Sequence, residues 1–154
     1  MINALAKEKI AITSNTPGRT QLVNFYDFLK FRLIDLPGYG YANVSKQKSY
    51  ELNELIYEFI ENRVNLFGVF LICDASVITD ADRDMVRYFK HKFKNFYVIL
   101  NKIDKIKDNE LKKQLPKICQ FLNIEQNNVI PISAKKNTNL NIVYKTILNI
   151  IKNK

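Results

Sequence analysis

The chain has 154 residues, of which 47% are hydrophobic and 25% charged. This composition is typical of a soluble globular protein. The length is sufficient for one domain with a real core and leaves no room for a second domain. No apolar run approaches the roughly 20 residues that span a bilayer and no basic-then-apolar leader opens the chain, so we expect a cytoplasmic protein with no membrane segment. We also expect a monomer. Cys73 and Cys119 form no CxxC pair, so a metal or disulfide framework is unsupported and both are expected in the core.

The formal net charge of +9 has two interpretations. Lysines that neutralise phosphates gain free energy from counterion release, so the charge points to a polyanionic partner such as RNA. Lysine, asparagine and isoleucine are all abundant, however, as an AT-rich coding sequence would make them. The charge can therefore also reflect compositional bias alone.

Strands and helices alternate after the first two dozen residues, which is typical of an α/β protein with a mostly parallel sheet and helices on both faces. The expected strands are residues 22–29, 31–36, 66–73, 96–100 and 129–132, with a turn in 27–30 between the first two. The last three are nearly continuous apolar runs, as in strands covered on both faces. Apolar residues three and four apart predict four helices, which include 52–60, 85–93, 111–122 and 140–150. Thr79 and Asp80 are the N-cap candidates for the second of these helices.

A turn of sequence Asp35-Leu36-Pro37-Gly38 follows the second expected strand. An aspartate in this position can hold Mg²⁺, usually through a water molecule. The glycine lets its backbone N–H approach a terminal phosphate with no side chain in the way. Asp-x-Pro-Gly is also a common turn sequence, so this motif depends on support from the others.

A second motif, Asn101-Lys102-Ile103-Asp104, follows the fourth expected strand. The Asp104 carboxylate can accept two hydrogen bonds from the N1–H and exocyclic amine of guanine, whereas adenine offers no such donor pair. Lys102 would lay its aliphatic stem along the ring, and Asn101 would tie neighbouring loops together. A solvated loop is the alternative interpretation of the tetrapeptide taken alone.

The third motif, Ser133-Ala134-Lys135, follows the last expected strand, where backbone N–H groups can meet the guanine oxygen. The order and strand-end placement of all three motifs argue against coincidence. Residues 7–21 are expected to form a loop, in which Thr20 is the candidate to close its hydroxyl onto Mg²⁺ when a third phosphate is present. Arg19 is equally compatible with a phosphate or RNA contact and with a solvated charge.

The motifs within Thr16-Pro-Gly-Arg-Thr-Gln-Leu-Val-Asn-Phe-Tyr, Asp35-Leu-Pro-Gly-Tyr-Gly-Tyr-Ala and Asn101-Lys-Ile-Asp-Lys resemble the EngB/YihA/YsxC family of ribosome-biogenesis GTPases, from Ile2 to the C-terminus. The resemblance implies a single P-loop GTPase domain over residues 1–154, Rossmann-like and three-layered, built on a six-stranded sheet. It implies GTP or GDP and Mg²⁺ as cofactors. It also implies a role in large ribosomal subunit assembly, through ribosomal RNA or assembly intermediates, and a link to cell division and septation.

Carried over to this sequence, the resemblance makes Thr20 the magnesium-binding threonine of switch I and Asp35 to Gly38 the switch II motif. Asn101, Lys102 and Asp104 become the guanine-reading residues, and Ser133 and Ala134 the last base contact. No catalytic residue is assigned, because Tyr39 stands where Ras-like enzymes have a glutamine, and hydrolysis without a partner should be slow. Ser76 and Asn137 also depart from the family, which often has arginine and glycine there.

The larger departure is the phosphate loop. Family members begin with a strand and then Gly-Arg-Ser-Asn-x-Gly-Lys-Ser-Ser, whereas this sequence starts at Met1-Ile2-Asn3-Ala4-Leu5, the segment just after it. Loss of that central strand would leave buried backbone groups unpaired, at about 1–3 kcal/mol each. We therefore expect that this is the N-terminally truncated sequence of a longer GTPase, for example because a late start codon was assigned. An upstream DNA sequence without an in-frame Gly-Lys-Ser would count against this.

Two functions remain open at this point. The first is a GTP-dependent switch in ribosome assembly, which as this chain alone should bind nucleotide weakly and catalyse little. The second is a non-enzymatic ribosome-binding or RNA-binding module on a degenerate GTPase scaffold that has lost nucleotide binding.

Overall fold

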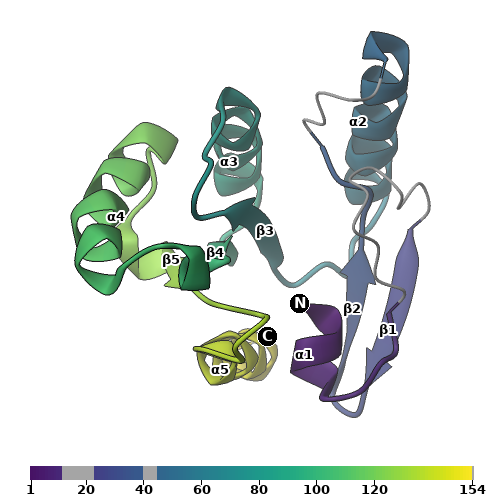
Figure 1. Cartoon of the computed structure of the whole chain (residues 1–154). Coiled ribbons are helices and arrows are strands. Elements are labelled where there is room, and N and C mark those ends of the chain that lie inside the picture. The colour runs from purple at the N-terminus through teal and green to yellow at the C-terminus, as the bar shows by residue number, and fades with distance from the viewer. Residues whose placement is uncertain (12–22, 40–44, 154) are drawn as a thin grey trace. The chain divides into compact units, whose positions relative to one another are not determined.

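The computed structural model describes residues 1–11, 23–39 and 45–153. Its chain forms two compact units, each with its own sheet (Figure 1). One unit comprises Phe67–Lys154 with Met1 and Asn3–Leu5, and the other comprises Ile2 and Ala6–Leu66. None of the described helices is both long and apolar enough to cross a membrane.

The smaller unit contains an antiparallel hairpin and a long helix. Strands β1 (Asn24–Phe28) and β2 (Phe31–Asp35) pair in register from Asn24 opposite Asp35 to Phe28 opposite Phe31. Both strands were predicted, although Leu22, the predicted start of the first, lies outside the described residues. Helix α2 (Lys46–Glu61) buries Leu52, Ile56 and Ile60, which are four residues apart and form one stripe, as predicted.

A short helix, α1 (Ile2–Ala6), was not among the predicted helices. Five residues are too few to show an apolar period, which is the signal that identified the other helices.

The larger unit is built on a parallel sheet of order β3-β4-β5, formed by Val69–Asp74, Phe96–Asn101 and Val129–Pro131. β4 is the central strand, and its residues Val98, Ile99 and Leu100 are completely buried. This confirms the prediction from continuous apolar runs. β3 begins three residues later than predicted, because its ladder starts only where Val69 comes opposite Phe96, the first residue of β4.

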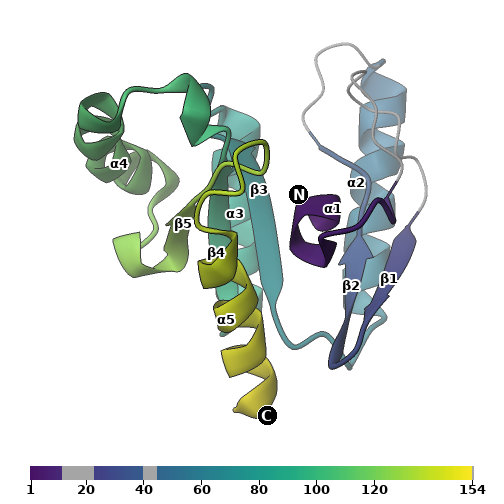
Figure 2. The same ribbon diagram turned by 60° about the horizontal axis from the view of Figure 1, so that its bottom comes forward.

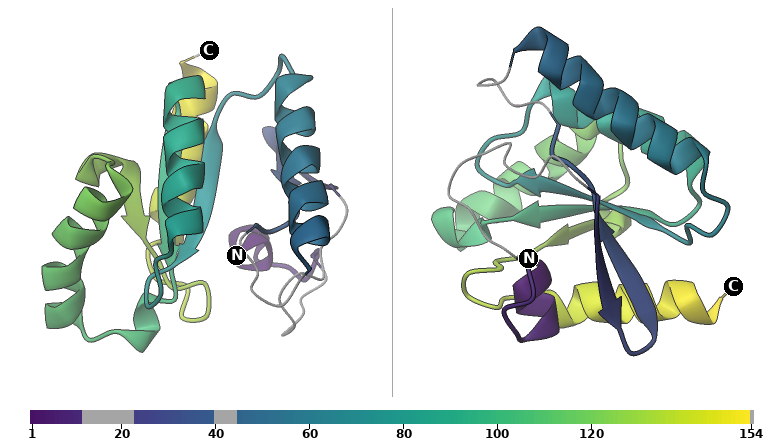
Figure 3. Two further views of the ribbon diagram at one scale, coloured as in Figure 1. Left: turned by 90° about the horizontal axis from the view of Figure 1, so that it is seen from above. Right: turned by 90° about the vertical axis from the view of Figure 1, so that its right-hand side faces the viewer.

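Three helices cover this sheet: α3 (Asp80–Lys92), α4 (Asp108–Leu122) and α5 (Leu140–Lys152). Helices α3 and α4 lie on one face and α5 on the other, as Figures 2 and 3 show. The apolar stripe of α5 is buried, as predicted, and consists of Leu140, Val143, Ile147 and Ile150. Both cysteines, Cys73 and Cys119, are buried, as predicted.

The start of α3 shows how the sequence fixes a helix end. Thr79 is the N-cap, and its hydroxyl accepts a hydrogen bond from the Asp82 backbone N–H at 3.3 Å. The Asp82 carboxylate accepts in return from the Thr79 backbone N–H at 2.7 Å. This capping box satisfies two backbone donors that a helix start otherwise leaves unpaired, and it confirms Thr79 as the cap.

Parallel strands all end at the same edge of their sheet. The segments that follow β3, β4 and β5 therefore leave the sheet at one edge, where Asp74, Asn101 and Ser133 lie. β3 is at one side of this sheet and, among the described residues, pairs only with β4. β2 pairs only with β1 in the described part of the smaller unit.

Candidate functional site

Asn101, the last residue of β4, joins two loops through one side-chain oxygen. Its Oδ1 accepts hydrogen bonds from the backbone N–H of Lys102 at 2.8 Å and from that of Ala134 at 3.1 Å. Lys102 has a φ of 68°, in the left-handed region that residues other than glycine rarely adopt. The two bonds thus hold a sharp turn after β4 against the loop after β5, which is the tie expected of Asn101.

Asp104 lies in the 3₁₀ turn η1 (Ile103–Lys105) and meets the side chain of Ser133. The Ser133 hydroxyl donates to Oδ1 of Asp104 and accepts from the Lys136 backbone N–H at 3.0 Å. The bond from Ser133 holds the pKa of Asp104 below its ordinary value. Asp104 is therefore ionised near neutral pH, and a carboxylate has about four lone-pair sites, so it can accept further donors.

The hydroxyl of Ser133 is a part of the site that the sequence did not reveal. The sequence assigned Ser133 a backbone contact with the base, whereas its completely buried side chain supports Asp104. The two residues are 29 positions apart, so only the folded chain shows the contact.

Asp74 is a second residue that the sequence analysis missed. The Lys102 ammonium donates to Oδ2 of Asp74 at 2.7 Å, and Ser76 donates to Oδ1 from its hydroxyl at 2.6 Å and its backbone N–H at 3.0 Å. Partial burial raises the pKa of Asp74, but the bonds from Lys102 and Ser76 outweigh it, and the pKa falls to about 2. The available signal was its position, since Asp74 ends an apolar strand just as Asn101 does.

The structure therefore brings together five predicted residues, all in the larger unit: Asn101, Lys102, Asp104, Ser133 and Ala134. The predicted Asp35, Leu36, Pro37 and Gly38 lie at the end of β2 in the smaller unit. Thr20 and Arg19 lie outside the described residues. The roles assigned to all of these residues stay predictions.

The predicted metal ligand Asp35 is half-buried, and burial raises its pKa. The described residues contain no group of three or more histidine, cysteine, aspartate or glutamate side chains that could hold a metal ion. Mg²⁺ usually keeps several waters and is bound by one or two carboxylates together with substrate phosphates. A single carboxylate at Asp35 fits that kind of coordination, because a bound cation would favour its ionised form.

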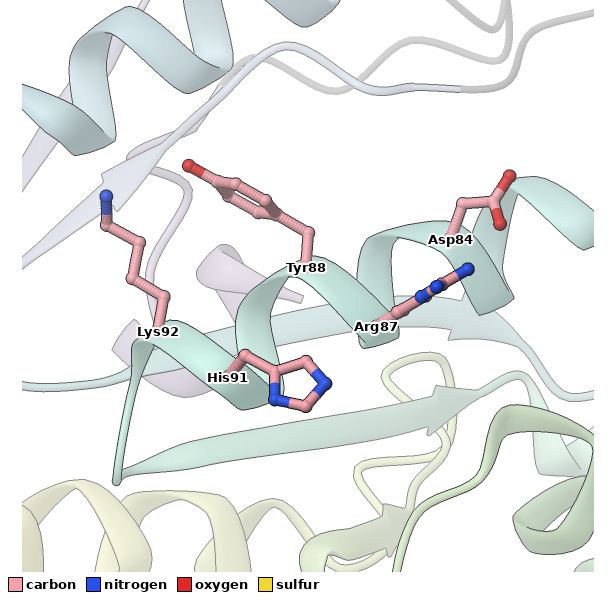
Figure 4. A pocket seen from close by; sticks show the side chains of 5 residues that line it. All are labelled: Asp84, Arg87, Tyr88, His91 and Lys92. Atoms are coloured by element: carbon pink, nitrogen blue, oxygen red, sulfur yellow. The ribbon is translucent and has the colours of Figure 1, made fainter.

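A hollow beside α3 is unrelated to these loops. Its lining side chains all come from one helix, as Figure 4 shows, and they are Asp84, Arg87, Tyr88, His91 and Lys92. Among the described residues, none of those predicted to bind the nucleotide lines it. His91 is exposed at this surface.

Replacing Ser133 by alanine tests the support of Asp104. The Lys136 N–H loses its acceptor beside a buried site, so we expect the free energy of unfolding to fall by about 1–3 kcal/mol. The pKa of Asp104 should rise toward its ordinary value. Urea denaturation and an NMR titration of the carboxyl carbon measure the two effects. Thr138→Ala, which removes an exposed hydroxyl from the same loop, should change neither, and an unchanged Asp104 pKa in Ser133→Ala would contradict the assignment.

The low pKa of Asp74 predicts how its ion pair responds to acid. A carboxylate with a folded-state pKa of about 2, below its ordinary value, stabilises the fold above pH 4 and loses this contribution as the pH falls toward 2. The stability difference between the wild type and Asp74→Asn should therefore be constant from pH 7 to about 4.5 and shrink at lower pH. Urea denaturation at several pH values measures it. A difference that is already lost at pH 5 would contradict the ion pair.

Residues 1–102 match the family model described as 50S ribosome-binding GTPase. The chain is 52% identical over 151 residues to the probable GTP-binding protein EngB of Malacoplasma penetrans, a match that covers 98% of this chain and 81% of that protein. It is 40% identical over 151 residues to the probable GTP-binding protein EngB of Mycoplasmoides gallisepticum, with the same coverage of 98% and 81%.

Solved structures show the same fold. A crystal structure of a probable GTP-binding protein engB matches with a TM-score of 0.81 and 21% identity, over 99% of this chain and 91% of that one. The structure of Era in complex with MgGDPNP and nucleotides 1506–1542 of 16S ribosomal RNA matches with a TM-score of 0.72 and 24% identity, over 97% of this chain and 51% of that one. The α/β fold is thus that of the P-loop GTPases. Its sequence identity to the EngB proteins shows that the chain belongs to the EngB family of GTP-binding proteins.

Proposed function

We propose that this protein is a guanine-nucleotide-dependent switch that acts in the assembly of the large ribosomal subunit. The observation that carries the proposal is the joined pair of strand-end loops, in which Asn101 holds Ala134 and Ser133 holds Asp104. In open α/β sheets, ligands bind beyond the carboxyl ends of the strands, which is where these loops lie. Family membership supports the same ligand.

The geometry supports a specific way of reading the base. The ionised Asp104 accepts from the N1–H and amine of guanine, while Ser133 fixes the orientation of the carboxylate. The Lys102 stem provides an apolar surface for the ring. The Ala134 N–H already donates to Asn101, so a guanine oxygen at this point shares that donor in a three-centre bond.

The other predicted residues would bind the phosphates and Mg²⁺. Asp35 would hold Mg²⁺ through water, the Gly38 N–H would face the terminal phosphate, and Thr20 would respond to the third phosphate. When bound, Mg²⁺ would neutralise part of the negative charge on the phosphates. Leu36 and Pro37 shape this turn, in which Pro37 is buried.

The ribosomal partner is supported by three observations. The matching family model is described as 50S ribosome-binding GTPase, the structurally similar Era is bound to 16S ribosomal RNA, and the net charge here is +9. Affinity for ribosomal RNA should fall steeply as salt rises, because phosphate contacts release counterions. Filter binding at about 50 and 200 mM KCl tests this. A flat salt dependence would contradict an RNA-binding role. A protein that acts on ribosomal precursors would be located in the cytoplasm, and this location and a role in cell division are part of the same proposal.

A second candidate is a ribosome-binding module that binds no nucleotide. The 154 residues include no Gly-Lys-Ser or Gly-Lys-Thr phosphate loop, so nucleotide binding by this chain has to be measured directly. Such a loop provides most of the contacts to the outer phosphates in this fold.

Titration with the fluorescent nucleotide mant-GDP separates the two candidates. The 154-residue chain is compared with a version extended by the upstream in-frame codons. Binding in the micromolar range by the extended version, and weaker binding by the given chain, supports the switch. Absence of binding in both supports the module. mant-ADP serves as the control for base specificity in each titration.

A further inference from the structure

The side chain of Lys102 is tied to a carboxylate on the neighbouring strand. Its ammonium donates to Oδ2 of Asp74 at 2.7 Å, although the two residues are 28 positions apart. The ammonium of Lys105 lies 4.0 Å from the same oxygen and is the weaker partner. The Lys102 side chain is half exposed and that of Asp74 only 26% exposed, so the pair lies at the surface with its carboxylate partly shielded.

The backbone places Asp74 in the right position for this contact. Asp74 and Asn101 are opposite each other in the β3-β4 ladder, and the Ala75 N–H donates to the Asn101 carbonyl at 2.8 Å. Ser76 then occupies one oxygen of Asp74 with two hydrogen bonds, which leaves Oδ2 turned toward Lys102. The carboxylate is therefore oriented by its own loop before it meets the lysine.

We propose that Asp74 is a positioning residue for guanine recognition, which stretches the Lys102 side chain across the strand ends and holds its stem in place for the base. The inference rests on the proposed function. A lysine side chain carries about 2 kcal/mol of rotamer entropy, and a side chain that is already ordered has less to lose when the ligand binds. The carboxylate of Asp74 also offsets the positive charge of the Lys102 ammonium and holds it away from the base, so the base packs against the methylene groups of the stem.

A double-mutant cycle tests this role in mant-GDP binding, with the upstream-extended protein as the reference if the given chain binds too weakly. Asp74→Asn should raise the Kd about tenfold, because the charged partner of Lys102 is lost. In a Lys102→Met background, which keeps an apolar stem without a charge, the same change should alter the Kd by less than about twofold. Preference for guanine over xanthine nucleotide should stay unchanged, because Asp104 reads the base.

Two further variants sharpen the test. Asp80→Asn removes a carboxylate from an exposed pair with Arg83 on α3 and should leave the Kd unchanged. Ser76→Ala keeps Asp74 but releases one of its two holding bonds, so it should raise the Kd about threefold and do so only when Lys102 is present. It provides a milder measure if Asp74→Asn unfolds the chain, which circular dichroism reports.

The outcomes distinguish the inference from the proposed function. A wild-type protein that binds no guanine nucleotide, in either length, overturns both. A wild type that binds, with Asp74→Asn and Ser76→Ala of equal affinity, overturns the positioning role alone. Equal losses with and without Lys102 also overturn it, because Asp74 would then act through another group.

Discussion

Asp104→Asn is expected to change the preferred ligand from guanine to xanthine nucleotide. Ser133 donates its hydroxyl to Oδ1 of Asp104, and an asparagine at this position can keep that bond only with its amide oxygen. Its NH₂ group would then face the base. Guanine presents donors there, whereas xanthine presents an oxygen at the position of the guanine amine.

The expected change is large because the loss of affinity for guanine nucleotide and the gain of affinity for xanthine nucleotide shift the preference in the same direction. The guanine amine meets a donor where it needs an acceptor, and we expect the Kd for GDP to rise by about a hundredfold or more, since hydrogen bonds to charged groups are among the stronger ones. Affinity for xanthosine diphosphate should rise. Competition of each nucleotide against mant-GDP or mant-XDP measures the switch.

A control for this variant is Asp108→Asn, which removes a carboxylate at the start of α4, close in sequence but outside the joined loops. It should bind GDP like the wild type. If Asp104→Asn retained its preference for guanine, the assignment of Asp104 to the base would be wrong, whatever the nucleotide affinity.

Asn101→Ala should weaken guanine nucleotide binding by about a hundredfold. The substitution removes the oxygen that accepts from both Lys102 and Ala134, so the loops after β4 and β5 lose their direct link. The left-handed turn at Lys102 also loses the bond that helps to hold it. Asp104 and Ser133 remain bonded to each other, so base specificity should persist while affinity falls.

The effect on the fold is expected to be smaller than the effect on binding. Two hydrogen bonds at a half-buried side chain correspond to a loss of about 2 kcal/mol in the free energy of unfolding. Urea denaturation and mant-GDP titration measure the two quantities on the same sample. Asn101→Asp keeps an acceptor oxygen in the same place and should recover most of the stability. An Asn101→Ala protein with wild-type affinity would show that the link between the loops is not required.

The strands and helices of this chain could be largely predicted, because their signals are local. Continuous apolar runs identified β3, β4 and β5, and stripes three and four residues apart identified α2 to α5. Thr79 was recognisable as a cap from its type and position. Boundaries were less predictable, since β3 begins where its partner β4 begins, and this depends on pairing between segments distant in sequence.

The sequence by itself determined which polar side chains follow the strands: a carboxylate at Asp104, an amide before it at Asn101, and a hydroxyl after the last strand at Ser133. Only the tertiary structure decided which of these groups meet. The hydroxyl of Ser133 supports Asp104, and Asp74, which no motif marked, holds Lys102. The physical reason is that residue type and strand position are local properties of a chain. A hydrogen bond between residues about thirty positions apart depends on the register of the parallel strands, which sets the side chains opposite one another at the sheet edge.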